Sequence, residues 1–266
     1  MKKQSLAMLR YRLDPVALFE DVGNDKHQPP YPWQVNALRS DSRRQLYLAS
    51  RQAGKSSVAA TRALWTAMFV PGSLVLMVSP SLPQSQEIFR KALTAYRDLG
   101  RPMGTAQESA LRLELGNGSR IVSLPGTERS NVGYTANLLI IDEAARTESA
   151  LVDAVLPTVA VSGGAIIALT TPMGSRGWFF DLWNTPGVDS TWERYLVTAD
   201  DVPSPELHAT VEEEREFRGE PHVRQNYYCS FEADESAFFD DPEVLHRSLT
   251  LVGDDEPLWF PERNAS

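Results

Sequence analysis

The sequence predicts an α/β protein with a mostly parallel central sheet and helices on both faces. Short apolar runs alternate with stretches of helical periodicity, which is the pattern of strands buried on both faces and joined by helices. Polar motifs directly follow two of these runs. In such sheets ligands bind at this place, outside the carboxyl ends of the strands. The runs with the clearest strand pattern are Leu46–Ala49, Leu74–Val78, Leu138–Ile141 and Ala165–Leu169.

The first half of the chain supplies a helical segment, two strands and two longer helices. Residues 1–45 are expected to be helical, and the strand at 46–49 follows. Apolar residues at helical spacing predict a helix from Ser56 to about Phe69, which Pro71 and Gly72 end. After the strand at 74–78, a second helix should run from Pro83 to Gly100.

The pattern then changes to a hairpin and returns to buried strands. Alternating leucines at 111–115, the turn Gly116-Asn117-Gly118 and the run 120–124 predict two antiparallel strands. Beyond Trp192 the regular pattern weakens, with a strand-like 195–197, a charged helix at 206–218 and a further element at 223–228. We therefore expect a core over 46–200, a small C-terminal lid subdomain over 201–235, and a linker or tail over 236–266.

Composition narrows the class of protein. A chain of 266 residues with 42% hydrophobic content can bury one substantial core. Its single cysteine, Cys229, excludes an intramolecular disulfide framework, and no apolar stretch approaches the ~20 residues that span a bilayer. The net charge of −9 argues against a broadly basic DNA-coating surface but leaves room for a local DNA contact. We expect an intracellular protein without a membrane partner.

The most specific motif lies between the first strand and the first long helix. A loop between a strand and a helix can point its backbone N–H groups at phosphates. In this loop Lys55 would reach the β/γ oxygens, and Ser56 would place its hydroxyl on Mg²⁺. The usual pattern begins with glycine, and this chain has Ala49 there. The predicted ATP-binding residues of the loop are Ser50, Arg51, Gln52, Ala53, Gly54, Lys55, Ser56 and Ser57.

A pair of acids closes the third buried strand. In phosphate-loop enzymes an aspartate at this point helps to hold Mg²⁺, and a following glutamate can polarise the attacking water. These roles fall on Asp142 and Glu143. Two motifs in this order, each at the end of a predicted strand, indicate nucleotide hydrolysis, with ATP and Mg²⁺ as the expected ligands.

The motifs together resemble the ATPase domain of the large terminase subunit of tailed phages, over roughly residues 30–235. The elements that carry the resemblance are Pro32-Trp33-Gln34, Ser50 to Ser56, Leu139 to Ala145 and Thr170-Thr171-Pro172. The resemblance implies a RecA-like ATPase that drives double-stranded DNA into a procapsid in the host cytoplasm. It implies a homo-oligomeric ring, a pentamer in this family, with the portal protein and the small terminase subunit as partners.

The resemblance also implies roles for single residues. Gln34 would read the adenine edge, Arg51 would sense the γ-phosphate, and Thr170 and Thr171 would couple hydrolysis to movement. For Gln34 the alternative is an ordinary surface residue, and for the two threonines it is a structural strand end.

Two features depart from the family. Large terminases usually carry a second, nuclease domain, which this chain has no room to include, so we expect no nuclease activity from it. Many relatives place Arg-Gly shortly before the acidic strand, where this chain has Val132-Gly133. The arginine finger, which acts in trans, is therefore expected to be Arg129, with Arg146 as the alternative.

Three other classes compete with this interpretation. A nucleic-acid helicase would share the glutamine and phosphate-loop motifs, but it usually carries a second ATPase fold on the same chain. A non-catalytic nucleotide switch would lack a glutamate such as Glu143. A small-molecule phosphotransferase would need a substrate pocket, which the sequence does not reveal.

Overall fold

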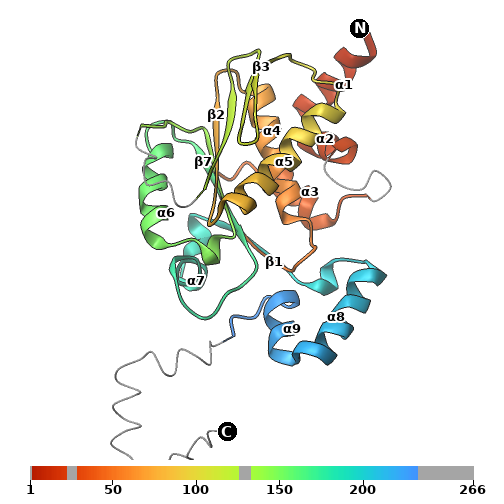
Figure 1. The fold of residues 1–266 in the computed structure, drawn as a ribbon, viewed down its shortest axis with the longest axis vertical. Helices are drawn as coiled ribbons and strands as arrows, with labels where there is room; N and C mark the ends of the chain where they lie inside the picture. Colours follow the sequence, from red (N-terminus) through yellow and green to blue (C-terminus); the bar gives the residue numbers. More distant parts are fainter. Residues whose placement is uncertain (1, 23–28, 126–132, 233–266) are drawn as a thin grey trace, which may run out of the picture.

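The computed structural model describes residues 2–22, 29–125 and 133–232, and a sheet of eight strands runs through them (Figure 1). The order across the sheet is β3-β4-β5-β2-β6-β7-β1-β8. Every neighbouring pair from β5 to β8 is parallel, whereas β4 is antiparallel to both β3 and β5. The strands are β1 Arg44–Ala49, β2 Leu74–Ser79, β3 Thr105–Glu108, β4 Arg112–Leu115, β5 Arg120–Pro125, β6 Leu138–Asp142, β7 Ala165–Thr170 and β8 Glu193–Val197.

The predicted fold class is confirmed, including the hairpin, which is the pair β4 and β5. The expected long helices are α4, α5 and α8, and the element expected at 223–228 falls largely within α9. The sequence analysis did not place β3, α6 or α7 as separate elements. The helices are α1 Lys2–Leu13, α2 Pro15–Val22, α3 Pro32–Arg39, α4 Lys55–Phe69, α5 Leu82–Asp98, α6 Ser149–Val155, α7 Trp178–Asn184, α8 Pro205–Arg218 and α9 Glu220–Tyr227.

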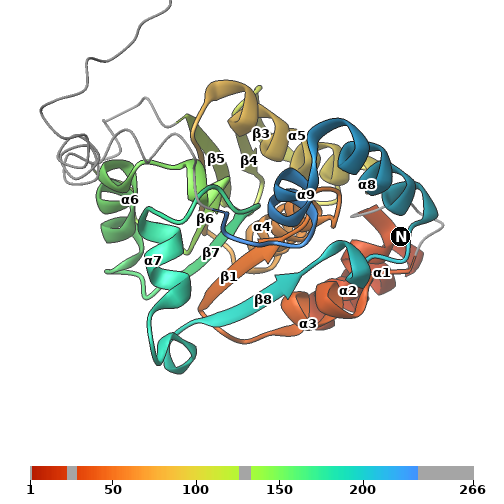
Figure 2. The same cartoon turned by 90° about the horizontal axis from the view of Figure 1, so that it is seen from below.

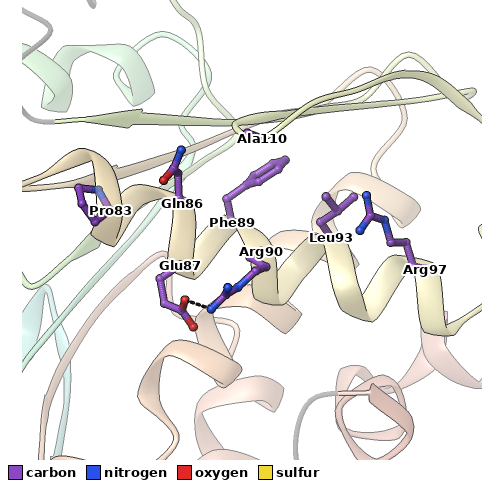
Figure 3. Close-up of a pocket in the computed structure, with 8 residues that line it drawn as sticks. All are labelled: Pro83, Gln86, Glu87, Phe89, Arg90, Leu93, Arg97 and Ala110. Carbon is purple, nitrogen blue, oxygen red and sulfur yellow. Dashed lines mark hydrogen bonds and ion pairs between the residues drawn. The ribbon is translucent and has the colours of Figure 1, made fainter.

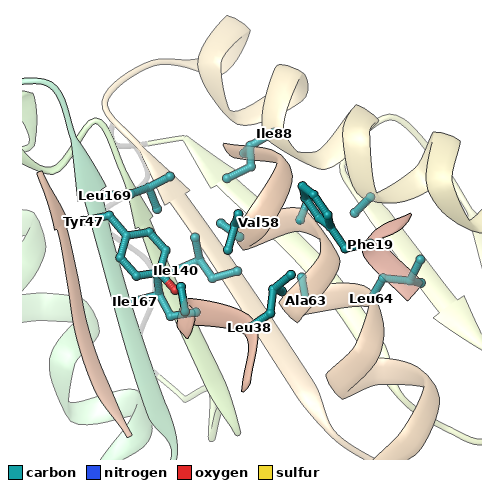
Figure 4. Close-up of a cluster of buried hydrophobic side chains, with 14 of the residues drawn as sticks. Phe19, Leu38, Tyr47, Val58, Ala63, Leu64, Ile88, Ile140, Ile167 and Leu169 are labelled. Carbon is teal, nitrogen blue, oxygen red and sulfur yellow. The ribbon is translucent and has the colours of Figure 1, made fainter. Parts of the chain in front are cut away.

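Both faces of the sheet are covered, because side chains of successive strand residues point to opposite faces. On one face Tyr47 of β1 packs with residues of β6 and β7 against helices α2, α3 and α4 (Figure 4). On the other face Leu46 and Leu48 belong to a second cluster, which α6 and α7 cover (Figure 1). A strand buried on both faces reads as a continuous apolar run, which is why the strands were visible in the sequence.

The strand order brings the polar motifs to one edge. Strand β7 lies between β1 and β6, with Leu48 opposite Thr170 and Asp142 opposite Leu169. All three strands are parallel, so their carboxyl ends meet at the same edge of the sheet. The phosphate loop after β1, the acids at the end of β6 and the threonines after β7 are therefore neighbours.

Helices α8 and α9 pack against each other below the sheet (Figures 1 and 2). They cover the region expected to form a lid, and that role stays a prediction. Among the described residues no helix combines the length and apolar character needed to cross a membrane.

The core predicts a specific stability loss. Ile140 is fully buried in β6, between Met77 of β2 and Ile167 of β7. Ile140→Ala leaves a cavity at the centre of the sheet and should lower the free energy of unfolding by about 2–5 kcal/mol. Urea denaturation followed by circular dichroism measures this. The control Val161→Ala, at a side chain 88% exposed, should change it by less than about 0.5 kcal/mol, and equal losses in both variants would contradict the assigned core.

Candidate active site

The loop between β1 and α4 has the backbone of an anion-binding nest. Gln52 and Gly54 both have left-handed conformations, with φ of 59° and 82°. Left-handed residues next to right-handed ones turn successive N–H groups toward one concave side, and the N-terminus of α4 continues it. A side chain at Gly54 would place its Cβ 2.6 Å from Nε2 of Gln34, so the close approach as well as the positive φ requires glycine here.

The deviation at the first position of the motif has a structural explanation. Ala49 is the last residue of β1 and pairs with Val197 of β8 in a parallel register. Its φ is not positive, and its carbonyl accepts a hydrogen bond of 3.3 Å from Oγ1 of Thr171. An extended strand residue does not need the conformational freedom of glycine, so alanine serves at this position.

Lys55 is buried at the centre of the site. Its Nζ donates to Oγ1 of Thr171 at 3.0 Å and to the carbonyl of Ser50 at 3.4 Å. Burial lowers the pKa of Lys55, and the negative charges of Glu143 and Asp142 oppose that shift. The ammonium group is thus hydrogen-bonded at the ends of β1 and β7, and the charges of both acids act on it.

Asp142 has the environment of a metal ligand. It is 7% exposed, and its Oδ1 has no hydrogen-bond partner among the described residues. Desolvation, followed by the neighbouring charge of Glu143, raises the pKa of Asp142 to about 6. A cation at this carboxylate would relieve both the burial and the missing partner. A single buried carboxylate fits Mg²⁺, because Mg²⁺ is usually held by one or two protein oxygens plus phosphates and water.

Glu143 begins a tight turn at the end of β6. Its backbone is left-handed, with φ 49° and ψ 46°, and the single 3₁₀ turn η1, Ala144–Arg146, follows. Its carboxylate oxygen Oε2 lies 2.5 Å from Nη1 of Arg146. The structure therefore brings Glu143 together with Arg146, a pairing that the sequence analysis did not anticipate.

The threonines at the end of β7 connect the other parts of the site. Thr171 contacts Lys55 and Ala49, as described above. Thr170 Oγ1 accepts a hydrogen bond of 3.2 Å from the N–H of Ala145, in the turn that follows the acids. Both threonines are buried, so they join the phosphate loop to the acidic turn through the sheet. Their coupling role stays a prediction.

Gln34 is fully buried and braces the phosphate loop. Its Nε2 donates to the carbonyl of Ala53 at 3.3 Å, and its Oε1 accepts from the N–H of Tyr31 at 2.9 Å. A glutamine amide has two N–H donors and two acceptor lone pairs, so one of each remains for another partner. The adenine-reading role of Gln34 therefore stays a prediction.

Two elements beyond the recognised motifs also hold the loop. The N–H of Ser50 donates to the carbonyl of Val197 at 2.7 Å, and the N–H of Arg51 donates to the carbonyl of Asn226 in α9 at 3.0 Å. The side chain of Arg51 is exposed. Sequence analysis missed Val197 and Asn226 because they act through main-chain carbonyls, which carry no residue signature.

Some predicted features cannot be placed, including the linker or tail over 236–266, which lies outside the described residues. Arg129 and Val132 lie outside the described residues, so the first candidate for the arginine finger has no position here. The second candidate, Arg146, borders a surface hollow of about 410 Å³ between the acidic turn and the segment Met173–Trp178. A cavity of about 390 Å³ lies along α5 near Ala110, and none of the predicted site residues lines it (Figure 3).

Comparison with solved structures supports this architecture. The ATPase domain of the large terminase of Thermus phage P74-26 matches with a TM-score of 0.66 at 24% identity, covering 80% of this chain and 97% of that one. The large terminase of another thermophilic bacteriophage, solved in complex with ADP, matches with a TM-score of 0.64 at 15% identity, covering 76% of this chain and 53% of that one. These matches show a shared fold.

Comparison of sequences shows the family. The large terminase subunit of Thermus phage G20c is 26% identical over 251 residues, which cover 81% of this chain and 51% of the relative. This chain thus spans about half the length of that relative. The family model described as terminase large subunit, T4likevirus-type, N-terminal, matches residues 46–245. Because this match covers most of the chain and includes the phosphate loop, both acids and the threonine pair, the chain belongs to the N-terminal family of large terminase subunits.

Proposed function

We propose that this chain hydrolyses ATP to drive double-stranded DNA into a phage procapsid. One observation carries the proposal: the buried ammonium of Lys55 lies among a phosphate loop, a pair of acids and a threonine, all at the carboxyl edge of one parallel sheet. These groups can bind the phosphates and orient the attacking water, and such positioning and charge stabilisation supply most of the catalysis of phosphoryl transfer.

The loop is suited to hold the phosphate chain of ATP. In the proposed complex the N–H groups from Gln52 to Ser57 face the phosphates, with Ser50 and Ala53 shaping the loop behind them. Lys55 would move from Thr171 toward the β/γ oxygens, and the exposed Arg51 would reach the γ-phosphate. The ADP complex of the thermophilic phage terminase supports a nucleotide ligand at this fold.

The two acids have separate proposed roles. The hydroxyl of Ser56 and the unpartnered Oδ1 of Asp142 would hold Mg²⁺. When bound, Mg²⁺ would neutralise charge that develops on the β/γ oxygens. Glu143, one residue further along, would orient the attacking water and accept its proton.

The motor function rests on the family. We propose double-stranded DNA as the moved substrate, a homo-oligomeric ring as the working form, and the portal protein and small terminase subunit as partners in the host cytoplasm. The net charge of −9 implies that DNA contacts are local rather than spread over the surface. Adenine recognition by Gln34 belongs to the same proposal.

Lys55→Ala and Glu143→Gln should fail in different ways. Loss of the Lys55 charge should weaken ATP binding by about 10–100-fold, because a charge-assisted contact to a polyanion is lost. Glu143→Gln should keep ATP affinity while turnover falls by about 10²–10⁴-fold, because only the water-activating group is removed. Calorimetric binding and phosphate release, each with and without duplex DNA, measure the difference. Normal turnover in both variants would reject the proposed site.

Thr171→Val should impair hydrolysis or DNA movement more than ATP binding. It keeps the side-chain shape but removes the acceptor for Lys55 and the donor to Ala49. We expect ATP affinity to change by less than about 10-fold, while hydrolysis or DNA moved per ATP falls. In the proposed complex Lys55 leaves Thr171 for the phosphates, so the bond that is lost is the neutral one to Ala49, which contributes about 0.5–1.5 kcal/mol. Thr171→Ser keeps the hydroxyl and is the matched control. If valine and serine variants both package DNA normally, Thr171 is only a strand end.

The proposed ring predicts dependence on assembly. Without a neighbour's arginine the isolated chain should be slow, because such a finger is worth about 10³–10⁵ in rate. Subunits with Arg129→Ala and intact Lys55, mixed with subunits carrying Lys55→Ala and intact Arg129, should regain activity that neither has alone. Phosphate release across a range of mixing ratios measures the recovery. Turnover per subunit that never changes with concentration or assembly would argue against a ring.

A further inference from the structure

We propose that Arg146 is a positioning residue that orients Glu143 of its own subunit. This inference rests on the proposed hydrolysis of ATP, in which Glu143 activates water. It assigns Arg146 a role in cis, in place of the finger role in trans that sequence analysis offered as an alternative. The geometry of the turn after β6 carries the argument.

A tight turn brings Glu143 and Arg146 together. Glu143 is left-handed, and the N–H of Arg146 donates to the carbonyl of Glu143 at 2.8 Å, which closes the 3₁₀ turn. This turn brings the two residues close, and Nη1 of Arg146 lies 2.5 Å from Oε2 of Glu143. The carboxylate and the guanidinium therefore meet through local backbone geometry.

Buried partners hold the turn in place. The hydroxyl of Thr147 donates to the carbonyl of Glu143 at 3.2 Å, and the N–H of Ala145 donates to the buried Oγ1 of Thr170. The left-handed conformation of Glu143 is unfavourable for a residue with a side chain, and it persists where surrounding contacts over-determine it. A turn held in this way fixes where the Glu143 side chain starts.

The ion pair occupies only one oxygen of the carboxylate. Arg146 Nη1 contacts Oε2, while Oε1 of Glu143 has no hydrogen-bond partner in the described parts of the chain. The two side chains are 28% and 24% exposed, so water reaches them. A carboxylate that is held through one oxygen and presents the other to solvent is arranged to orient a water molecule.

A role as the finger in trans conflicts with this pairing. To reach the γ-phosphate of a neighbouring subunit, Arg146 would have to leave Glu143, and the turn would lose its side-chain contact. Arg146 lines the hollow between the acidic turn and residues 173–178. An arginine that stays in cis keeps Glu143 oriented throughout the cycle, and Arg129 then remains the candidate for the finger.

Single-turnover hydrolysis tests the assignment. Arg146→Ala should lower the rate of hydrolysis by about 10–100-fold, since a misplaced catalytic group has this order of effect, while ATP affinity changes by less than about 3-fold. Arg146→Lys should recover part of the rate because it keeps the charge. The matched control is Arg90→Ala, which breaks an exposed ion pair of the same spacing with Glu87 on α5 and should leave the rate unchanged.

A double-mutant cycle identifies the partner of Arg146. If Arg146 acts through Glu143, the variant with both Glu143→Gln and Arg146→Ala should hydrolyse ATP no more slowly than Glu143→Gln alone. Multiplying losses, or an Arg146→Ala variant with the normal rate, would overturn the inference. If Glu143→Gln itself retains the normal rate, the proposed function has failed instead.

A mixing experiment separates cis from trans. Subunits with Arg146→Ala, combined with Lys55→Ala subunits, should stay as inactive as each alone, because every active site then lacks one of its own groups. Recovery of activity in that mixture would reassign Arg146 to the neighbouring subunit. The mixture of Arg129→Ala with Lys55→Ala subunits is the positive control for assembly.

Discussion

The buried ammonium of Lys55 is the constraint on which the site depends. A charge taken out of water is unfavourable unless hydrogen bonds and opposite charges replace its hydration. Here the carbonyl of Ser50 and the hydroxyl of Thr171 accept its hydrogen bonds, and Asp142 and Glu143 supply negative charge nearby. These groups come from the ends of three strands. The location of a single ammonium group therefore explains why the carboxyl edges of β1, β6 and β7 have the residues they do.

The sheet sets the dimensions of this arrangement. Strand β7 separates β1 from β6, and neighbouring strands lie about 4.8 Å apart, so the phosphate loop and the acids begin about 10 Å from each other. The intervening strand places Thr170 and Thr171 in the middle of the gap. The hydroxyl of Thr171 contacts Lys55 and Ala49, and the hydroxyl of Thr170 contacts the acidic turn at Ala145. The two adjacent threonines together therefore connect both sides, which is the physical basis for a proposed coupling role.

Contacts within the chain hold the phosphate loop in shape. Gln34 contacts it from α3, Val197 from β8 and Asn226 from α9. The contacts from β8 and α9 are made by main-chain carbonyls, so they depend on the position of an element rather than on its side chains. A displacement of α9 would act directly on the N–H of Arg51. Preorganisation of this kind reduces the conformational entropy that nucleotide binding must overcome.

The sequence by itself determined the fold class, the strands with continuous apolar runs and the residues of the phosphate and acidic motifs. These features are local, because burial on both faces and phosphate binding each require particular residue types at short spacing. Tertiary structure alone decided that Ala49 is tolerated in an extended strand, that Gln34 braces the loop, and that Glu143 pairs with Arg146. It also decided which backbone carbonyls hold the loop. All of these contacts depend on strand order and on backbone dihedral angles. Strand order brings together groups that are distant in the sequence, and the dihedral angles turn the side chains of near neighbours toward each other. No residue pattern encodes either of them.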